Sequence, residues 1–150
     1  VKGDMEYYSK LSHEVTQVIQ ERVPLMEKAS IDEFYLDLTG MDQFFGCYKW
    51  SKEIAQSVTH ETGLPISFAL STNKTVSKIG TGESKPLGRL EIQEPNIRPF
   101  LNPLSVRKIP MVGEVTFQLL SRIGIRTIQT LSEMPVRVLE QMIGKNGIEL

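Results

Sequence analysis

The chain has 150 residues, of which 40% are hydrophobic and 23% are charged, and its formal net charge at pH 7 is -1. This length and apolar content suffice for one globular domain with or without a small satellite, and they exclude a disordered or fibrous protein. This overall charge argues against a surface wholly committed to nucleic acid, although it is unevenly spread, at -3 over residues 1–92 and +2 over residues 93–150. The single cysteine, Cys47, excludes an internal disulfide, and no apolar run approaches the roughly 18 residues of a membrane span. We therefore expect an intracellular, cytoplasmic protein without membrane attachment.

The first part of the chain predicts a two-layer α+β unit. Apolar residues recur at three- and four-residue steps from Met5 to Val23, which is the pattern of an amphipathic helix. Further on, short alternating runs indicate strands and Gly63 indicates a helix end. In order we expect a helix, two extended segments, a helix, a strand, a short helix and a strand, over residues 5–23, 25–31, 34–38, 42–61, 65–71, 72–80 and 89–92.

The second part of the chain predicts a linker and a small helical domain. The tract from Glu94 to Pro110 contains four prolines, a density that breaks long elements and suits a linker. Beyond it the pattern is helical only, with Gly-containing turns between predicted helices over residues 115–123, 127–134 and 136–143. We therefore predict two domains, an α+β domain over residues 1–92 and an all-helical domain over residues 93–150.

Two adjacent carboxylates, Asp32 and Glu33, stand in a run that otherwise reads as a buried strand. An ionised carboxylate in a low dielectric is costly unless it is paired, hydrogen-bonded or bound to a cation. The alternation of the flanking segments places the pair at or near a bend between strands. Such a pair can hold Mg²⁺, which favours one or two carboxylates plus substrate phosphates, and two metals there would assist phosphoryl transfer. The alternative is a solvated hairpin turn.

Three lysines, Lys74, Lys78 and Lys85, follow the strand predicted at residues 65–71. Lys74 and Lys78 are four residues apart and so lie on one helical face, whereas Lys85 precedes Pro86 in a constrained turn. Ammonium groups near a metal are what the recognition of a triphosphate requires. A solvated helix face is the alternative interpretation for the helical pair.

Residues 109–125 resemble a helix-hairpin-helix motif. In that motif a tight turn presents the backbone N–H groups of a helix N-terminus to a DNA phosphate, without base specificity. Met111 stands where such turns usually have glycine, so a side chain occupies a position that usually has none. A plain helical turn is the alternative.

Four segments in this order and spacing resemble a Y-family DNA polymerase of the bacterial polymerase IV type. They are Ser30-Ile31-Asp32-Glu33-x-Tyr35-Leu36-Asp37, Ser71-x-Asn73-Lys74-x-x-x-Lys78-Ile79, Lys85-Pro86-x-Gly88 and residues 109–125. The resemblance covers essentially the whole chain. It implies that residues 1–92 form part of a polymerase palm, an antiparallel sheet with helices packed on one face. Residues 93–150 would be the thumb with its helix-hairpin-helix.

The resemblance also implies the activity and its residues. The activity is translesion DNA-directed DNA synthesis, in which a nucleotidyl group passes from a dNTP to a primer 3′ hydroxyl. Asp32 would be a metal ligand and Glu33 the acidic active-site residue and a second candidate ligand, with two Mg²⁺ per active site in the full enzyme. Lys85 would contact the triphosphate of the incoming nucleotide, and Lys78 would lie near the site.

The thumb hairpin would grip the duplex backbone around Val112, Gly113 and Val115. Primer-template DNA and dNTP are the implied partners, together with a sliding clamp bound through a region beyond Leu150. The family's first metal motif, of the Asp-x-Asp-x-Phe type, would lie upstream of Val1, and the fingers and little finger are absent. We therefore expect an excised palm-plus-thumb fragment that has no useful polymerase activity alone. Two alternatives stay open: a non-catalytic DNA-backbone-binding module, and another palm-type nucleotidyl enzyme such as a nucleotide cyclase.

Overall fold

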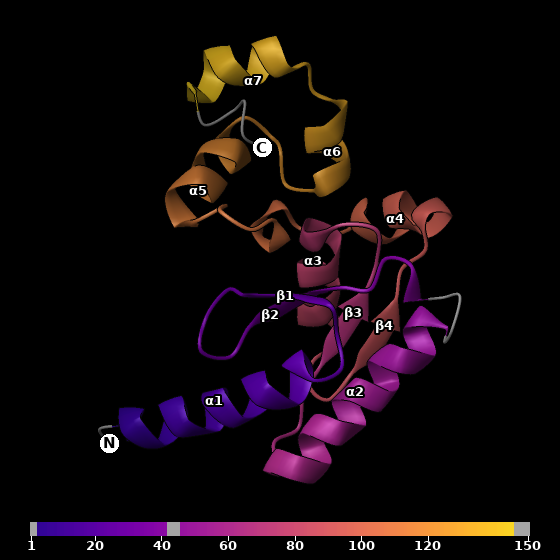
Figure 1. Cartoon of the computed structure of the whole chain (residues 1–150). Helices are drawn as coiled ribbons and strands as arrows, with labels where there is room; N and C mark the ends of the chain where they lie inside the picture. Colours follow the sequence, from indigo (N-terminus) through magenta and orange to yellow (C-terminus); the bar gives the residue numbers. More distant parts are fainter. Residues whose placement is uncertain (1–2, 42–45, 146–150) are drawn as a thin grey trace. The chain divides into compact units, whose positions relative to one another are not determined.

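The computed structural model describes residues 3–41 and 46–145 (Figure 1). In chain order its elements are α1 (Met5–Gln20), β1 (Leu25–Lys28), β2 (Phe34–Asp37), α2 (Cys47–Thr62), β3 (Phe68–Leu70), α3 (Lys74–Ser84), β4 (Arg89–Glu91), α4 (Glu94–Leu101), the 3₁₀ turn η2 (Val106–Lys108), α5 (Glu114–Arg122), α6 (Ile128–Glu133) and α7 (Val136–Ile143). The predicted α+β class is confirmed. The start of the second predicted helix, residues 42–45, lies outside the described residues. Within the described part of the chain, no helix is both long enough and apolar enough to cross a membrane.

The chain divides into two compact units, and no single cut separates them. The first unit comprises Val1–Leu70 and Gly80–Glu91, and the second comprises Ser71–Ile79 and Ile92–Leu150. The chain therefore passes between the units at three points, one of which lies inside α3.

The first unit is built on two amphipathic helices and an antiparallel hairpin. Asp4 is the N-cap residue of α1, because its carboxylate accepts a hydrogen bond of 3.0 Å from the Tyr7 amide. The inner faces of α1 and α2 pack together with residues from the strands, and this apolar core comprises Val15, Val18, Ile19, Val23, Leu38, Ile54 and Val58. Burial of each such side chain contributes about 1.5–3 kcal/mol. The hairpin β1–β2 pairs Leu25 with Asp37 and Lys28 with Phe34. This register leaves residues 29–33 as the loop between the two strands.

The second strand pair, β3 and β4, is parallel, with Phe68 opposite Arg89 and Leu70 opposite Glu91. The predicted antiparallel sheet therefore describes the first strand pair and not the second. The reason is the connection: parallel neighbours need a crossover, and here α3 supplies it. Asn73 caps this helix, since its side chain accepts a 2.9 Å hydrogen bond from the Val76 amide.

The helix α4 occupies the tract that we predicted to be a linker. Its first turn contains Pro95, where an amide hydrogen has no partner within the helix anyway, so proline is tolerated. Pro99 lies inside the same short helix. The prediction of a linker from the number of prolines was wrong for residues 94–101. The effect of a proline depends on its position in the helix.

The helices after residue 104 surround a small apolar core of their own. Its buried members are Val106, Leu120, Ile125, Leu131 and Leu139. Backbone bonds tie the segment before η2 to the start of α6: the Val106 amide donates to Arg126 O at 3.0 Å, and the Ile128 amide donates to Leu104 O at 2.9 Å. The three predicted helices of this region are confirmed within a few residues at their ends.

Candidate functional site

Asp32 and Glu33 lie in the loop that joins β1 to β2, and both are exposed. The amides of Ala29 and Ser30 donate to Glu33 O at 2.9 Å and 3.2 Å, which closes the loop. The Ser30 hydroxyl donates to Asp32 Oδ1 at 2.9 Å. The predicted bend is therefore present, and the run read as a buried strand is interrupted at the carboxylates, where water can reach both of them.

Helix α1 supports this loop from inside the unit. The Ser12 hydroxyl donates to the carbonyl oxygen of Ile31, the residue before Asp32. One helical turn later, Thr16 Oγ1 donates to Ser12 O at 2.7 Å and accepts from Lys28 Nζ at 3.2 Å. Sequence reasoning missed Ser12 as part of this region; the only indication was a serine on the apolar face of a helix.

The carboxylate pair provides the right class of donor for Mg²⁺ but only part of a ligand set. Carboxylate oxygens are hard ligands, and Mg²⁺ requires near-octahedral coordination that it usually completes with water and phosphate oxygens. Among the described residues there is no group of three or more His, Cys, Asp or Glu side chains that could hold a metal ion. Among the described residues, Asp32 and Glu33 could therefore supply only two of the ligands that Mg²⁺ requires.

A third carboxylate of the hairpin, Asp37, is already engaged. It accepts hydrogen bonds from Thr39 Oγ1 at 2.6 Å and from the Thr39 amide at 2.9 Å. These bonds favour the ionised form and lower the pKa of Asp37, with the hydroxyl bond the larger cause. Asp37 thus has a structural partner and ends β2.

Lys85 is exposed in the turn between α3 and β4, in the same unit as the carboxylates. The turn closes tightly on the end of α3: a Cβ atom at Gly88 would lie 1.7 Å from the carbonyl oxygen of Ser84. The chain that carries Lys85 can therefore follow this path only with glycine at position 88. Lys78 is also exposed on α3, but it belongs to the second unit, whereas the carboxylates belong to the first.

The segment between η2 and α5 contains a tight turn from Ile109 to Val112. The Val112 amide donates to Ile109 O at 3.2 Å, Pro110 occupies the second position, and Met111 at the third has a φ of 75°. A positive φ at this position is the requirement of a type II turn, and it explains why glycine is usual there. Met111 is 82% exposed.

The N-terminus of α5 follows this turn and presents backbone amides without a side-chain cap. Gly113 is the N-cap residue, with φ -83° and no side-chain hydrogen bond, and a Cβ atom there would meet nothing within 4 Å. Val115 in the first turn is 75% exposed. Beside it, Arg107 pairs with Glu114 at 3.1 Å and lies 3.8 Å from the centre of the Phe117 ring. This end of α5 is therefore exposed and has no side-chain cap.

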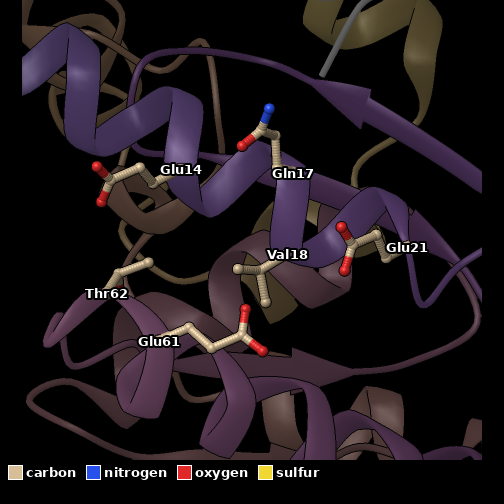
Figure 2. Close-up of a pocket in the computed structure, with 6 residues that line it drawn as sticks. All are labelled: Glu14, Gln17, Val18, Glu21, Glu61 and Thr62. Atoms are coloured by element: carbon tan, nitrogen blue, oxygen red, sulfur yellow. The ribbon is translucent and has the colours of Figure 1, made fainter.

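A hollow of about 200 Å³ lies elsewhere on the first unit, between α1 and the end of α2 (Figure 2). Its carboxylates are Glu14, Glu21 and Glu61, and Arg22 pairs with Glu61 at 2.9 Å. None of the predicted site residues lines it, so the hollow is separate from the candidate site.

Residues 1–82, just over half of the chain, match the profile of the impB/mucB/samB family. The chain belongs to the impB/mucB/samB family. Its similarity to curated relatives extends beyond the profile: a DNA polymerase IV of Alkaliphilus oremlandii is 33% identical over the whole chain, which covers 38% of that relative. A DNA polymerase IV of Clostridium kluyveri is 34% identical with the same coverages of 100% and 38%. The chain thus spans about two fifths of the length of these relatives.

Solved structures agree with the impB/mucB/samB assignment. A crystal structure of DinB from Sulfolobus solfataricus matches with a TM-score of 0.88 and 26% identity, over 99% of this chain and 44% of that one. An insertion ternary complex of Dbh DNA polymerase matches with the same score and identity, over 97% of this chain and 43% of that one. These findings confirm the resemblance to Y-family polymerases of the polymerase IV type.

Proposed function

We propose that this chain forms part of a translesion DNA-directed DNA polymerase, in which it supplies two catalytic carboxylates and a surface for duplex DNA. The observation that supports this best is the exposed Asp32-Glu33 pair, held at a hairpin loop in a chain whose fold matches polymerases along nearly its whole length. Residues 1–92 would act as part of the palm, and residues 93–150 as the thumb.

In this proposal Asp32 and Glu33 hold Mg²⁺ at the primer terminus. The metal would stabilise the charge that develops on the leaving pyrophosphate and lower the pKa of the attacking hydroxyl. Lys85, and Lys78 on α3, would bind triphosphate oxygens through their ammonium groups. Because the described residues provide only part of a ligand set, we expect weak metal binding and no useful primer extension by the chain alone.

The open N-terminus of α5 would bind the sugar-phosphate backbone of the duplex. The backbone amides near Val112, Gly113 and Val115 favour an anion, as does the helix dipole. The charge of the second unit agrees, since it carries nine Lys and Arg against five Asp and Glu. A clamp partner bound beyond residue 150 belongs to the same proposal.

A metal titration tests the first role. We expect Mn²⁺ to broaden the NMR signals of residues 30–34 selectively, and the double variant Asp32→Asn/Glu33→Gln to abolish that broadening. Asp37→Asn is the matched control, because it removes a carboxylate of the same hairpin that Thr39 already engages. Equal broadening in the double variant would refute metal binding by the pair.

Binding of duplex DNA, followed by fluorescence anisotropy, tests the second role. Gly113→Ala adds one methyl group at a position with free space and an ordinary φ, so the fold should tolerate it while a closely approaching phosphate should not. We expect affinity to fall about tenfold, the cost of losing one charge-assisted hydrogen bond. Gly82→Ala, which also has nothing within 4 Å, is the control and should leave affinity unchanged. Unaltered binding by Gly113→Ala would exclude this mode.

Two further measurements separate the alternatives. The first compares salt-dependent DNA binding with primer extension in a full-length parent protein. A binding module would be favoured if the double variant Asp32→Asn/Glu33→Gln left DNA binding unchanged and the parent protein did not extend a primer. Formation of a cyclic product from a triphosphate would favour a cyclase, an alternative that the matched polymerases do not favour.

A further inference from the structure

Ser12 is the one buried polar residue among those that the structure describes, with 7% of its surface exposed. A buried hydroxyl lowers stability unless it has a hydrogen-bond partner. Its neighbours on the same face of α1 include Val15 and Ile19, which belong to the apolar core, so packing alone would favour an apolar side chain at position 12. The hydroxyl is therefore explained by its bond to the Ile31 carbonyl.

The position of this bond gives it a consequence for the carboxylates. The Ile31 carbonyl and the Asp32 amide belong to one planar peptide unit. Fixing the carbonyl oxygen therefore fixes the orientation of the peptide that leads into the Asp32 Cα atom. Residues 29–33 are all exposed, so this contact connects a loop on the surface to a buried anchor.

A second contact from the same helix face reaches the start of the loop. Lys28, the last residue of β1, donates to Thr16 and lies 5.5 Å from the centre of the Phe34 ring. Ser12 and Thr16 are one turn apart and are linked by the 2.7 Å bond from Thr16 Oγ1 to Ser12 O. The two hydroxyl residues thus hold both the end of β1 and the middle of the loop against α1.

We propose that Ser12 is a positioning residue for the metal-binding carboxylates, acting through the Ile31–Asp32 peptide. This inference rests on the proposed function, since it assigns Ser12 a role in the metal site of Asp32 and Glu33. Ser12 touches neither metal nor substrate. Its hydroxyl restricts the orientation of the peptide that leads into Asp32, as partners of metal ligands restrict those ligands in other sites.

The test compares Mn²⁺ affinity and loop dynamics in three variants of the chain. Ser12→Ala removes the hydroxyl, Ser12→Cys keeps nearly the same size but has a poor donor, and Ser12→Thr keeps the hydroxyl. Ser9→Ala, an exposed serine of the same helix, is the control. Mn²⁺ affinity is measured by NMR line broadening, and loop dynamics by amide hydrogen exchange at residues 31–33.

We expect Ser12→Ala and Ser12→Cys to bind Mn²⁺ about tenfold more weakly than the wild type and to exchange the loop amides faster. Ser12→Thr should keep the Mn²⁺ affinity and the exchange rate of the loop amides near their wild-type values, and Ser9→Ala should change neither quantity. Unchanged Mn²⁺ affinity in Ser12→Ala or Ser12→Cys would overturn the inference, and so would unchanged exchange. If the wild type itself binds no Mn²⁺, the proposed metal role fails, and the exchange data alone decide whether Ser12 orders the loop. If Ser12→Ala does not fold, Ser12→Cys decides.

Discussion

Substitution of Gly88 by alanine should disrupt the turn that carries Lys85. The added Cβ would lie 1.7 Å from Ser84 O and 2.5 Å from Ser84 C, and both atoms belong to the backbone at the end of α3. To reach the 3.0 Å below which Cβ contacts essentially never occur, one backbone must move by about 1.3 Å. The Gly88 carbonyl also accepts from the Phe68 amide at 3.2 Å, so that movement disturbs the β3–β4 pair.

We expect Gly88→Ala to lower the free energy of unfolding by about 3 kcal/mol, the upper end of the usual cost of overpacking. The matched control is Gly82→Ala, six residues before Gly88 and inside α3, where a Cβ meets nothing within 4 Å. That variant should raise stability by about 0.5–1 kcal/mol, because alanine favours helix over glycine. Urea unfolding followed by circular dichroism measures both. A Gly88→Ala variant as stable as the wild type would refute the close approach of the two backbones.

Three other predictions test separate parts of the structure. Met111→Gly should raise the free energy of unfolding by about 0.5–1 kcal/mol, because glycine relieves the strained positive φ but gains unfolded-state entropy; a loss of stability in urea unfolding would contradict the turn geometry. Folding favours the ionised form of Asp37, because its pKa is lower in the folded protein. Its contribution to the stability of the fold is therefore present above about pH 4 and is lost as the pH falls through that lowered pKa. Thr39→Ala should raise that pKa in a carbon-13 NMR titration, and an unmoved pKa would sink the assignment of its cause. Leu120→Ala, at a fully buried position, should destabilise the protein by about 2–5 kcal/mol, whereas Leu119→Ala, at a position 38% exposed, should cost about 0.5 kcal/mol in the same assay; equal losses would contradict the assigned core.

The sequence predicted the helices best, because their apolar spacing is a local property. The stripe of α1 and the helices after residue 113 were placed to within a few residues. The direction of the β3–β4 pair was not predicted, since it depends on how α3 returns the chain rather than on the strands themselves. The helix α4 was missed because Pro95 was counted as a breaker, although it lies in the first turn.

For the candidate site, the sequence identified the loop but not its support. Asp32 and Glu33 are visible as charge within an apolar run, and the structure places them at the bend that the strand pattern predicted. The contact from Ser12 joins positions 19 residues apart, and nothing in the local pattern encodes such a pairing. The role of Asp32 and Glu33 in metal binding stays a prediction. The same holds for the roles of Lys85, Lys78 and the turn before α5.

The division of α3 between the two units limits how this protein can be recombined. A chimera that exchanges the second unit with that of a relative by a single crossover at residue 92 would leave Ser71–Ile79 behind. Those residues would then face a foreign core that did not evolve with them. Exchange of residues 71–79 together with the C-terminal part avoids that mismatch, so evolution and engineering alike have to treat these two distant stretches as one inherited piece.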